Sequence, residues 1–399
     1  MSPPSGFRLA VVLSHPTQYY SPWFRWLAAN TELDLRVFYL WDFGSSVRRD
    51  PQFQKAFQWD VDLLSGYASE FVPNSSRDPG PHHFTGLRNP SLAARLEAWR
   101  PSALLLFGYK WMSHLRAAAW ARKSGVPVIF RGDSHLLGRS APGPIRSLPL
   151  RWLFGRFSAF AYVGKENRAY FEAFGVPRER LFFSPHSVDD RLYDPGDLQN
   201  RTAAAALRAK LALNDGTKVV LFAGKMIPAK QPRELLKAFM DLGPPNTALV
   251  FVGDGEERRG LEKAARSATP GTVHFLPFAN QTQMPARYLL ADLFVLPSRG
   301  LYETWGLAVN EAMHMGVPCL VSDRVGCHAD LVTPGETGWV FRSESPDDLS
   351  EQLATALATV AEPAAAERLR QAVLARIAGF TYAETTKGLF SAINHLLRR

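Results

Sequence analysis

Short apolar runs alternate with amphipathic helical patterns along the second half of this 399-residue chain, and this alternation restricts its fold more than any other feature. Strand-like runs occur at residues 218–224, 247–253, 272–276, 292–297, 317–322 and 337–341. Helical patterns lie between them, for example at residues 233–242, 256–267 and 306–315. Such alternation predicts a parallel sheet with helices on both faces.

The first half shows the same rhythm less regularly, with strand-like runs at residues 7–14, 33–40, 102–107, 126–131 and 158–163. Between residues 40 and 83 the pattern lapses into Gly, Pro, Asp and Ser, which indicates long loops near a ligand cleft. A polar, Ala-rich passage at residues 194–215 separates the halves. We therefore predict an α/β protein with two Rossmann-like domains, 1–193 and 217–378, a linker at 194–216 and a final helix at 379–399. Parallel sheets that face each other leave a ligand cleft between them.

Two carboxylates flank a predicted helix start in the second domain. Glu303 and Glu311 are separated by seven residues, and the helix is expected to begin at Gly306. The backbone amides of Gly306, Leu307 and Ala308 would be donors without helical partners, next to the positive end of the helix dipole. This arrangement suits an anionic ligand with hydroxyl groups. The alternative, acids that only stabilise the helix start, explains Glu303 but not Glu311.

A second candidate phosphate-binding group follows the strand-like run 218–224. Gly224 and Lys225 stand just past this run, and Lys230 follows five residues later. Cations at a strand's carboxyl end neutralise the charge of a departing diphosphate. Solvated loop lysines are the alternative.

Glu303 to Glu311 resembles the E-x7-E signature of the retaining glycosyltransferases of family 4, which have the GT-B fold. The resemblance implies that Glu303 contacts the donor sugar, that Glu311 contacts the ribose, and that the Leu307 and Ala308 amides hold the diphosphate. It also implies that the C-terminal helix crosses back to the first domain. Lys225 stands where the family usually has Arg, which removes a bidentate phosphate contact.

The resemblance adds two weaker donor-site candidates in the second domain. Gly253 lies in a turn similar to the family's Gly-x-Gly and would allow close approach of backbone to ligand, although a plain strand-to-helix turn explains it equally well. Phe278 lies where family members hold the nucleotide base, and an ordinary buried aromatic is its alternative.

Candidate acceptor residues come from the first domain. Its first loop, residues 14–22, lacks the family's usual glycines and resembles a subgroup that reads His-Pro-x-Gln-Tyr, so His15 and Gln18 are candidates for acceptor or phosphate contacts. Arg131, Asp133 and His135 follow another strand, where Asp133 would orient the acceptor hydroxyl and His135 would bind sugar or share a proton. An ion pair between Arg131 and Asp133 is the structural alternative. The turn at residues 185–189 is expected to shape the cleft without taking part in chemistry.

The family resemblance implies a metal-independent, retaining hexosyltransferase that moves a sugar from a UDP- or GDP-sugar to the hydroxyl of a carbohydrate or lipid-linked acceptor, in cell-surface polysaccharide or glycolipid synthesis. No cofactor is expected: no Asp-x-Asp pair lies in a cleft turn, and His82 and His83 lack partner acids at ligand spacing. Two alternatives stay open, a sugar-nucleotide epimerase of the same fold and a non-catalytic nucleotide-sugar-binding subunit.

Net charge is +9 with a pI near 9.6, which favours anionic partners. Basic and aromatic residues interleave at residues 139–168, a pattern typical of docking to an anionic membrane surface or of a half-buried domain helix. Nucleic acid is not expected as a partner because no reader motif accompanies the charge.

Only two cysteines, Cys319 and Cys327, are present, and no apolar run approaches the ~18 residues of a membrane span. We expect a cytoplasmic protein, in contact with the inner face of the membrane if the docking interpretation holds.

Overall fold

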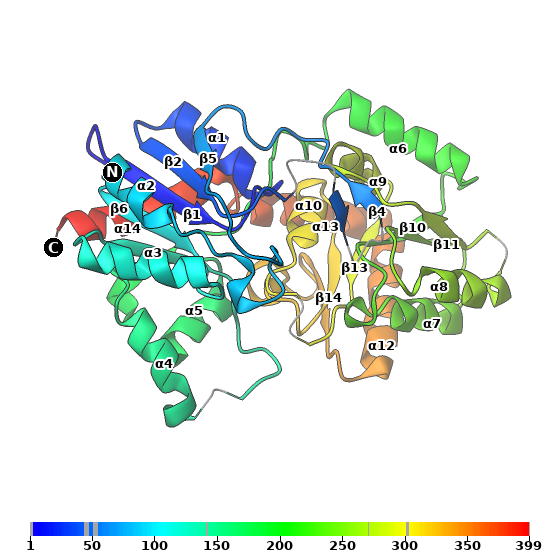
Figure 1. The fold of residues 1–399 in the computed structure, drawn as a ribbon. Coiled ribbons are helices and arrows are strands. Elements are labelled where there is room, and N and C mark those ends of the chain that lie inside the picture. Colours follow the sequence, from blue (N-terminus) through cyan, green and yellow to red (C-terminus); the bar gives the residue numbers. More distant parts are fainter. Residues whose placement is uncertain are drawn as a thin grey trace.

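The computed structural model describes residues 3–43, 48–50, 55–140, 143–269, 271–300 and 303–398. Two α/β domains lie side by side, with the first domain to the left and the second to the right in Figure 1. Each is built around a parallel sheet, so the predicted fold class is confirmed.

The first sheet has seven strands, all parallel, in the spatial order β5 (Ala68–Phe71), β2 (Asp34–Tyr39), β1 (Arg8–Leu13), β6 (Ala103–Phe107), β7 (Val128–Gly132), β8 (Ala159–Tyr162) and β9 (Leu181–Phe183). Successive side chains of a strand point to opposite faces. Accordingly, Leu9 and Val11 join one buried cluster while Ala10 and Val12 join another. Both faces of the sheet are therefore covered.

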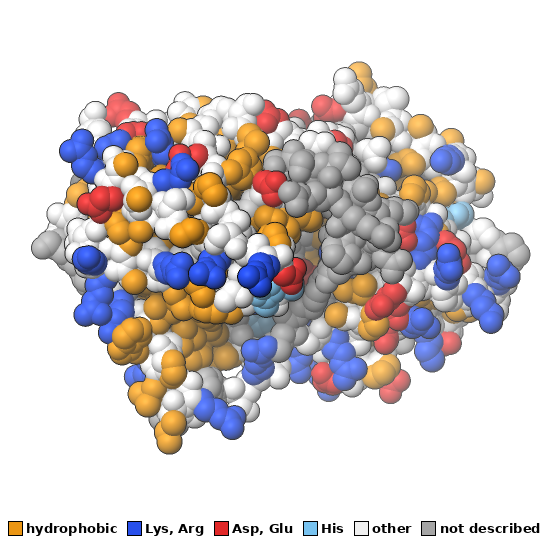
Figure 2. All heavy atoms as spheres, viewed as in Figure 1, with side chains coloured by type: hydrophobic (Ala, Val, Ile, Leu, Met, Phe, Trp, Pro, Cys, Tyr) orange, Lys and Arg blue, Asp and Glu red, His pale blue; other side chains and the backbone are white. Residues whose placement is uncertain are grey.

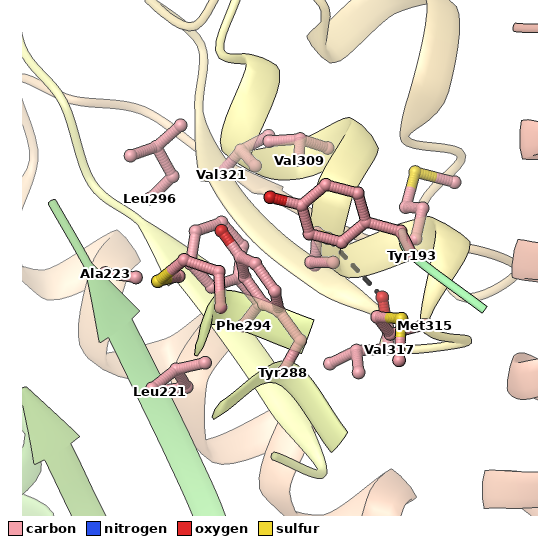
Figure 3. Packing of buried hydrophobic residues seen from close by; sticks show 14 of the residues in the cluster. Tyr193, Leu221, Ala223, Tyr288, Phe294, Leu296, Val309, Met315, Val317 and Val321 are labelled. Carbon is pink, nitrogen blue, oxygen red and sulfur yellow. Dashed lines mark hydrogen bonds between the residues drawn. The ribbon is translucent and has the colours of Figure 1, made fainter. Parts of the chain in front are cut away.

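The second sheet has six parallel strands in the order β12 (Val273–Leu276), β11 (Thr247–Val252), β10 (Lys218–Ala223), β13 (Leu293–Leu296), β14 (Cys319–Ser322) and β15 (Gly338–Phe341). All six lie within or next to the predicted runs. Figure 3 shows part of the cluster on one face, where the rings of Tyr288 and Phe294 lie beside Leu221 and Ala223 of β10, with centroids 5.5 Å apart.

Helices surround both sheets. Those of the first domain are α1 (Tyr20–Asn30), α2 (Leu92–Trp99), α3 (Met112–Lys123), α4 (Pro144–Phe154) and α5 (Lys165–Ala173), with short 3-10 turns η1 (Phe84–Gly86) and η2 (Arg178–Arg180). Those that follow are α6 (Leu198–Lys210), α7 (Pro232–Leu242), α8 (Arg258–Ala264), α9 (Met284–Leu289), α10 (Leu307–His314), α11 (His328–Leu331), α12 (Pro346–Ala361), α13 (Pro363–Ile377) and α14 (Tyr382–Leu397), with 3-10 turns η3 (Pro228–Lys230), η4 (Ala265–Ser267) and η5 (Gln281–Gln283). Among the described residues, none of the helices combines the length and apolar content needed to cross a bilayer.

The stretch from residue 40 to residue 83, expected to be loops, contains regular structure. β5 adds an edge strand to the first sheet, and β3 (Arg48–Asp50) pairs with β4 (Lys55–Phe57) in an antiparallel ribbon. The expectation of loops throughout is wrong, because an edge strand with the sequence Ala-Ser-Glu-Phe is too polar and too short to show an apolar pattern.

The C-terminal helix α14 returns to the first domain. Its apolar residues Leu389 and Ile393 join the buried cluster of β1 and β2, and Trp23 Nε1 donates a 3.0 Å hydrogen bond to Thr386 Oγ1. The chain thus crosses between the domains twice. The two crossings touch, because Ser184 Oγ donates to the Thr385 carbonyl at 2.8 Å. Both termini accordingly lie on the first domain in Figure 1.

Candidate active site

A cavity of about 410 Å³ lies between the two domains, where the carboxyl ends of the strands of both sheets meet. Most of the predicted residues line it. From the first domain these are His15, Gln18 and Asp133, and from the second they are Gly224, Lys225, Lys230, Phe278, Glu303, Gly306, Leu307, Ala308 and Glu311. Arg131, His135 and Gly253 do not line it. The fold therefore gathers at one place residues that are widely separated in sequence.

The start of α10 faces the cavity. Gly306 precedes the helix with a φ of +99°, and a Cβ there would lie 2.7 Å from Val325 Cγ1, so only glycine fits this turn. Leu307 and Ala308 form the first positions of the helix and line the cavity. Their backbone amides lack helical acceptors, and the helix dipole is positive at this end. The helix start can therefore bind an anion such as a diphosphate.

Lys230 and Glu303 form an ion pair at the cavity wall. Lys230 Nζ lies 2.8 Å from Glu303 Oε2, and Ser298 Oγ donates to the same oxygen at 3.1 Å. The two side chains are only 12% and 16% exposed, so water screens the pair weakly. The site thus presents a fixed cation for a phosphate and a fixed carboxylate for sugar hydroxyls.

Glu311 is buried at the cavity floor and held by tyrosines. Tyr288 donates to its Oε2 at 2.8 Å and Tyr19 to its Oε1 at 3.1 Å. Burial raises the pKa of this carboxyl, while the tyrosine hydrogen bonds oppose the rise. Tyr19 belongs to the first domain, so one of these bonds crosses the cleft. The sequence of α10 gives no indication that either tyrosine contacts Glu311.

Asp133 bridges the domains at the other end of the cavity. It accepts a 2.8 Å hydrogen bond from Thr304 Oγ1 of the second domain and remains 43% exposed. The ring of His15 lies edge-on to Trp41 and Phe43, and burial lowers its pKa to about 4. His15 is thus neutral near pH 7, and Asp133 stands open to an acceptor.

His186 is a cavity residue to which sequence reasoning assigned no chemistry. It is 3% exposed, and its Nε2 has no hydrogen-bond partner among the described residues, with Asp133 Oδ2 lying 3.9 Å away. Burial holds the pKa of His186 well below its usual value, and the nearby Arg131 cation adds to this effect. The sequence signal for its place in the cavity was that it lies three residues after β9, in the turn expected to shape the cleft.

Arg131 lies behind the cavity wall instead of in it. It is 2% exposed, and its guanidinium donates to the carbonyls of Ser184 at 2.8 Å and Pro185 at 3.2 Å. The ion pair with Asp133 considered above is not formed within the described structure. Arg131 therefore fixes the turn that carries His186, and the structure does not support an acceptor contact.

His135 is also committed to the protein. Its Nδ1 accepts from the Leu137 amide at 3.1 Å, so the proton sits on Nε2, which lies 3.3 Å from the Glu303 carbonyl oxygen. Burial lowers the pKa of His135. With both ring nitrogens engaged, this residue positions the backbone of Glu303 and does not line the cavity.

Gly253 lies against the backbone of a neighbouring turn and does not line the cavity. A Cβ at this position would lie 2.0 Å from the Gly224 carbonyl oxygen. The glycine therefore lets the turns after β10 and β11 pack together, which is the structural alternative considered for it.

Asp78 lies beside the adjacent histidines of the first domain. Its Oδ2 is 2.7 Å from His82 Nε2 and 3.3 Å from His83 Nε2. The expectation that these histidines lack an acid at ligand spacing is wrong, because the turn at residues 78–83 folds back on itself. The group is largely exposed and lies outside the cavity.

Fold and cavity together define a two-domain α/β protein with a cavity between the edges of two parallel sheets. Two family models match the chain, the glycosyl transferase 4-like domain over residues 48–186 and glycosyl transferases group 1 over residues 204–373. The chain belongs to the glycosyltransferases of family 4, as its motifs predicted, and its fold is GT-B.

Curated relatives carry glycosyltransferase names. A D-inositol 3-phosphate glycosyltransferase of Nocardia farcinica is 31% identical over 250 residues, which cover 59% of this chain and 52% of the relative. One of Segniliparus rotundus is 27% identical and is covered to 74%, against 79% of this chain. A GDP-mannose-dependent alpha-(1-6)-phosphatidylinositol monomannoside mannosyltransferase of Mycolicibacterium smegmatis is 28% identical, with 60% of this chain and 63% of the relative covered. The chain thus spans about half the length of the first of these relatives.

Solved structures share the fold over almost the whole chain. Anabaena HepE in complex with UDP and glucose superposes with a TM-score of 0.71 at 17% identity, covering 97% of this chain and 99% of HepE. Sucrose-phosphate synthase of Thermosynechococcus elongatus superposes with a TM-score of 0.72 at 18% identity, covering 98% and 99%. Identities this low establish the fold alone.

Proposed function

We propose that this protein is a retaining glycosyltransferase that moves a sugar from a UDP- or GDP-sugar to an acceptor hydroxyl in cell-surface polysaccharide or glycolipid synthesis. One observation carries the proposal. A single cavity presents a helix start, the Lys230–Glu303 pair and the buried Glu311 from the same domain. In this proposal the helix start would bind the diphosphate, Glu303 the sugar and Glu311 the ribose of a nucleotide sugar.

The donor would lie along the second domain. Its diphosphate would rest on the Leu307 and Ala308 amides with Lys225 and Lys230 alongside, because these are the cationic and amide groups at the cavity wall. Its sugar would reach Glu303, and its ribose would reach Glu311. Phe278 lines the remaining end, where the base would lie. The GDP-mannose and UDP named for a relative and for a structural neighbour are consistent with such a donor.

The chemistry would proceed on one face of the sugar. The bond from the anomeric carbon to the phosphate oxygen breaks as the acceptor oxygen bonds to that carbon, and the acceptor proton passes to the departing phosphate. Charge builds on the phosphate in the transition state, where Lys230, Lys225 and the helix amides would stabilise it. No metal ion or other cofactor is part of this proposal, since these protein groups would supply the positive charge.

The acceptor would enter from the first domain, where His15, Gln18 and Asp133 line the cavity. The partly exposed Asp133 carboxylate would accept a hydrogen bond from the acceptor hydroxyl and so orient its oxygen. A cytoplasmic location fits the two cysteines, which are both buried and unpaired.

A thermal-shift screen over UDP-, GDP- and ADP-sugars tests the donor assignment, because a ligand that binds the folded state raises its melting temperature. The stabilising donor is then incubated with acceptors, and the anomeric configuration of the product is determined by NMR. We expect a product with the donor's configuration. Absence of stabilisation by every nucleotide sugar would overturn the proposal. Conversion of the donor without any acceptor would point to an epimerase instead.

A further inference from the structure

Helix α4 carries an apolar face that the protein leaves uncovered. Ile145, Leu148 and Trp152 are 81%, 59% and 62% exposed. Their spacing of three and four residues places them on one side of the helix. Ser147 and Phe154 on the opposite side are buried. The helix therefore packs on the domain with one face and presents a second apolar face outward.

Arginines border this apolar face. At 100° per residue, Arg146 and Arg151 fall on its two flanks, and both are exposed. Arg156, one turn beyond Trp152, places its guanidinium 3.1 Å from the centroid of the indole ring. Figure 2 shows hydrophobic and basic side chains together on the projection that α4 forms at the lower left of the molecule. No acidic residue occurs in the sequence from 134 to 165, so this charge is uncompensated along the chain.

We propose that the α4 surface, defined by Ile145, Leu148, Trp152 and the flanking Arg146 and Arg151, docks onto an anionic lipid bilayer. An outward apolar face with a tryptophan and a rim of long basic side chains matches the interface of a bilayer, where the apolar groups enter the acyl boundary and the arginines reach lipid phosphates.

The position of α4 links this surface to the cavity. Asp133 at the cavity wall and Pro144 at the start of α4 are eleven residues apart in the sequence, so the docking surface and the acceptor side of the cavity belong to the same domain. Docking would present the cavity to acceptors that reside in the membrane. This last step rests on the proposed function, whereas the docking itself does not.

The test is co-sedimentation of the full chain with vesicles of phosphatidylcholine, with and without phosphatidylglycerol. We expect binding to the phosphatidylglycerol vesicles that weakens as salt is raised. The variant Ile145→Ser/Leu148→Ser/Trp152→Ser should bind roughly 100-fold more weakly, because three apolar side chains no longer enter the interface. Leu198→Ser is the matched control, since Leu198 is 77% exposed on α6 of the other domain. It should bind like the unmodified chain.

Equal vesicle binding by the triple variant and the unmodified chain would overturn the proposal. A dimer in sedimentation velocity that disappears in the triple variant would also overturn it, in favour of an interface between copies. UDP affinity is measured on the same samples by calorimetry. Loss of vesicle binding with retained UDP affinity shows that the triple variant is folded. Vesicle binding by a chain that binds no nucleotide would leave docking intact and contradict the proposed function.

Discussion

Tyr19 donates a 3.1 Å hydrogen bond to Glu311 Oε1 and so joins the two domains across the cavity. Tyr288 holds the other carboxylate oxygen from within the second domain. Each carboxylate oxygen can accept more than one hydrogen bond, so Glu311 can keep both tyrosines while it accepts a ribose hydroxyl. The carboxylate is therefore oriented before a nucleotide arrives, and the first domain contributes to a contact assigned to the second.

Replacing Glu311 with Gln should weaken binding of UDP or GDP by roughly 10- to 100-fold, because the amide nitrogen cannot accept the hydrogen bonds that the carboxylate accepts. Calorimetric titration of the nucleotide measures the change. Glu336→Gln is the control, since this glutamate is exposed elsewhere in the second domain. An unchanged affinity of the Glu311→Gln variant would remove the proposed ribose contact.

Lys230→Met should lower kcat by about 100-fold or more, because a fixed cation beside the departing phosphate acts mainly on the transition state. The loss of the cation also leaves Glu303 without its partner. Steady-state kinetics with the identified donor gives kcat and KM separately. Lys237→Met, at a 77% exposed position on α7, should behave like the unmodified chain. Unaltered turnover of the Lys230 variant would contradict its role.

His186→Phe should leave the melting temperature of the unliganded protein nearly unchanged and reduce turnover about tenfold. The phenyl ring keeps the contacts of the imidazole with Tyr20 and Trp305, and Nε2 has no hydrogen bond to lose within the described structure. We expect Nε2, in a side chain that lines the cavity, to bond a hydroxyl of the donor sugar, so the loss should appear only when a sugar is bound. The diagnostic comparison is calorimetry with UDP and with the UDP-sugar. Equal effects on both ligands would mean that His186 does not face the sugar.

Acid should destabilise the protein, and His114 should account for part of the effect. Burial lowers the pKa of His114 from 6.5 to about 3. Between these values the unfolded chain binds a proton that the folded chain does not, so stability falls as pH falls, by about 1.4 kcal/mol per pH unit for one such group. His114→Phe should flatten the dependence by that amount in urea denaturation between pH 6 and about 4.

The sequence predicted what is local. Central strands such as β10 are buried on both faces and therefore form continuous apolar runs. The relation between Glu303, the helix start and Glu311 is likewise set within nine consecutive residues. Both could be recognised without knowing how distant parts of the chain meet.

Long-range partners could not be predicted in this way. Arg131 lies in β7 and Asp133 directly follows it, yet one side chain points behind the cavity and the other into it. The direction depends on the carbonyls of Ser184 and Pro185, more than fifty residues away. Tyr19 and Tyr288 reach Glu311 for the same reason, since tertiary packing alone brings three distant segments together.

The contact between Ser184 and Thr385 has a mechanical consequence. Ser184 follows β9 and Thr385 lies in α14, which packs on the first domain, so this bond ties the two connections together where they leave that domain. Rotation about it keeps both connections intact. We expect the cleft to open by such a rotation, which would lengthen the distance between Tyr19 and Glu311 across the cavity.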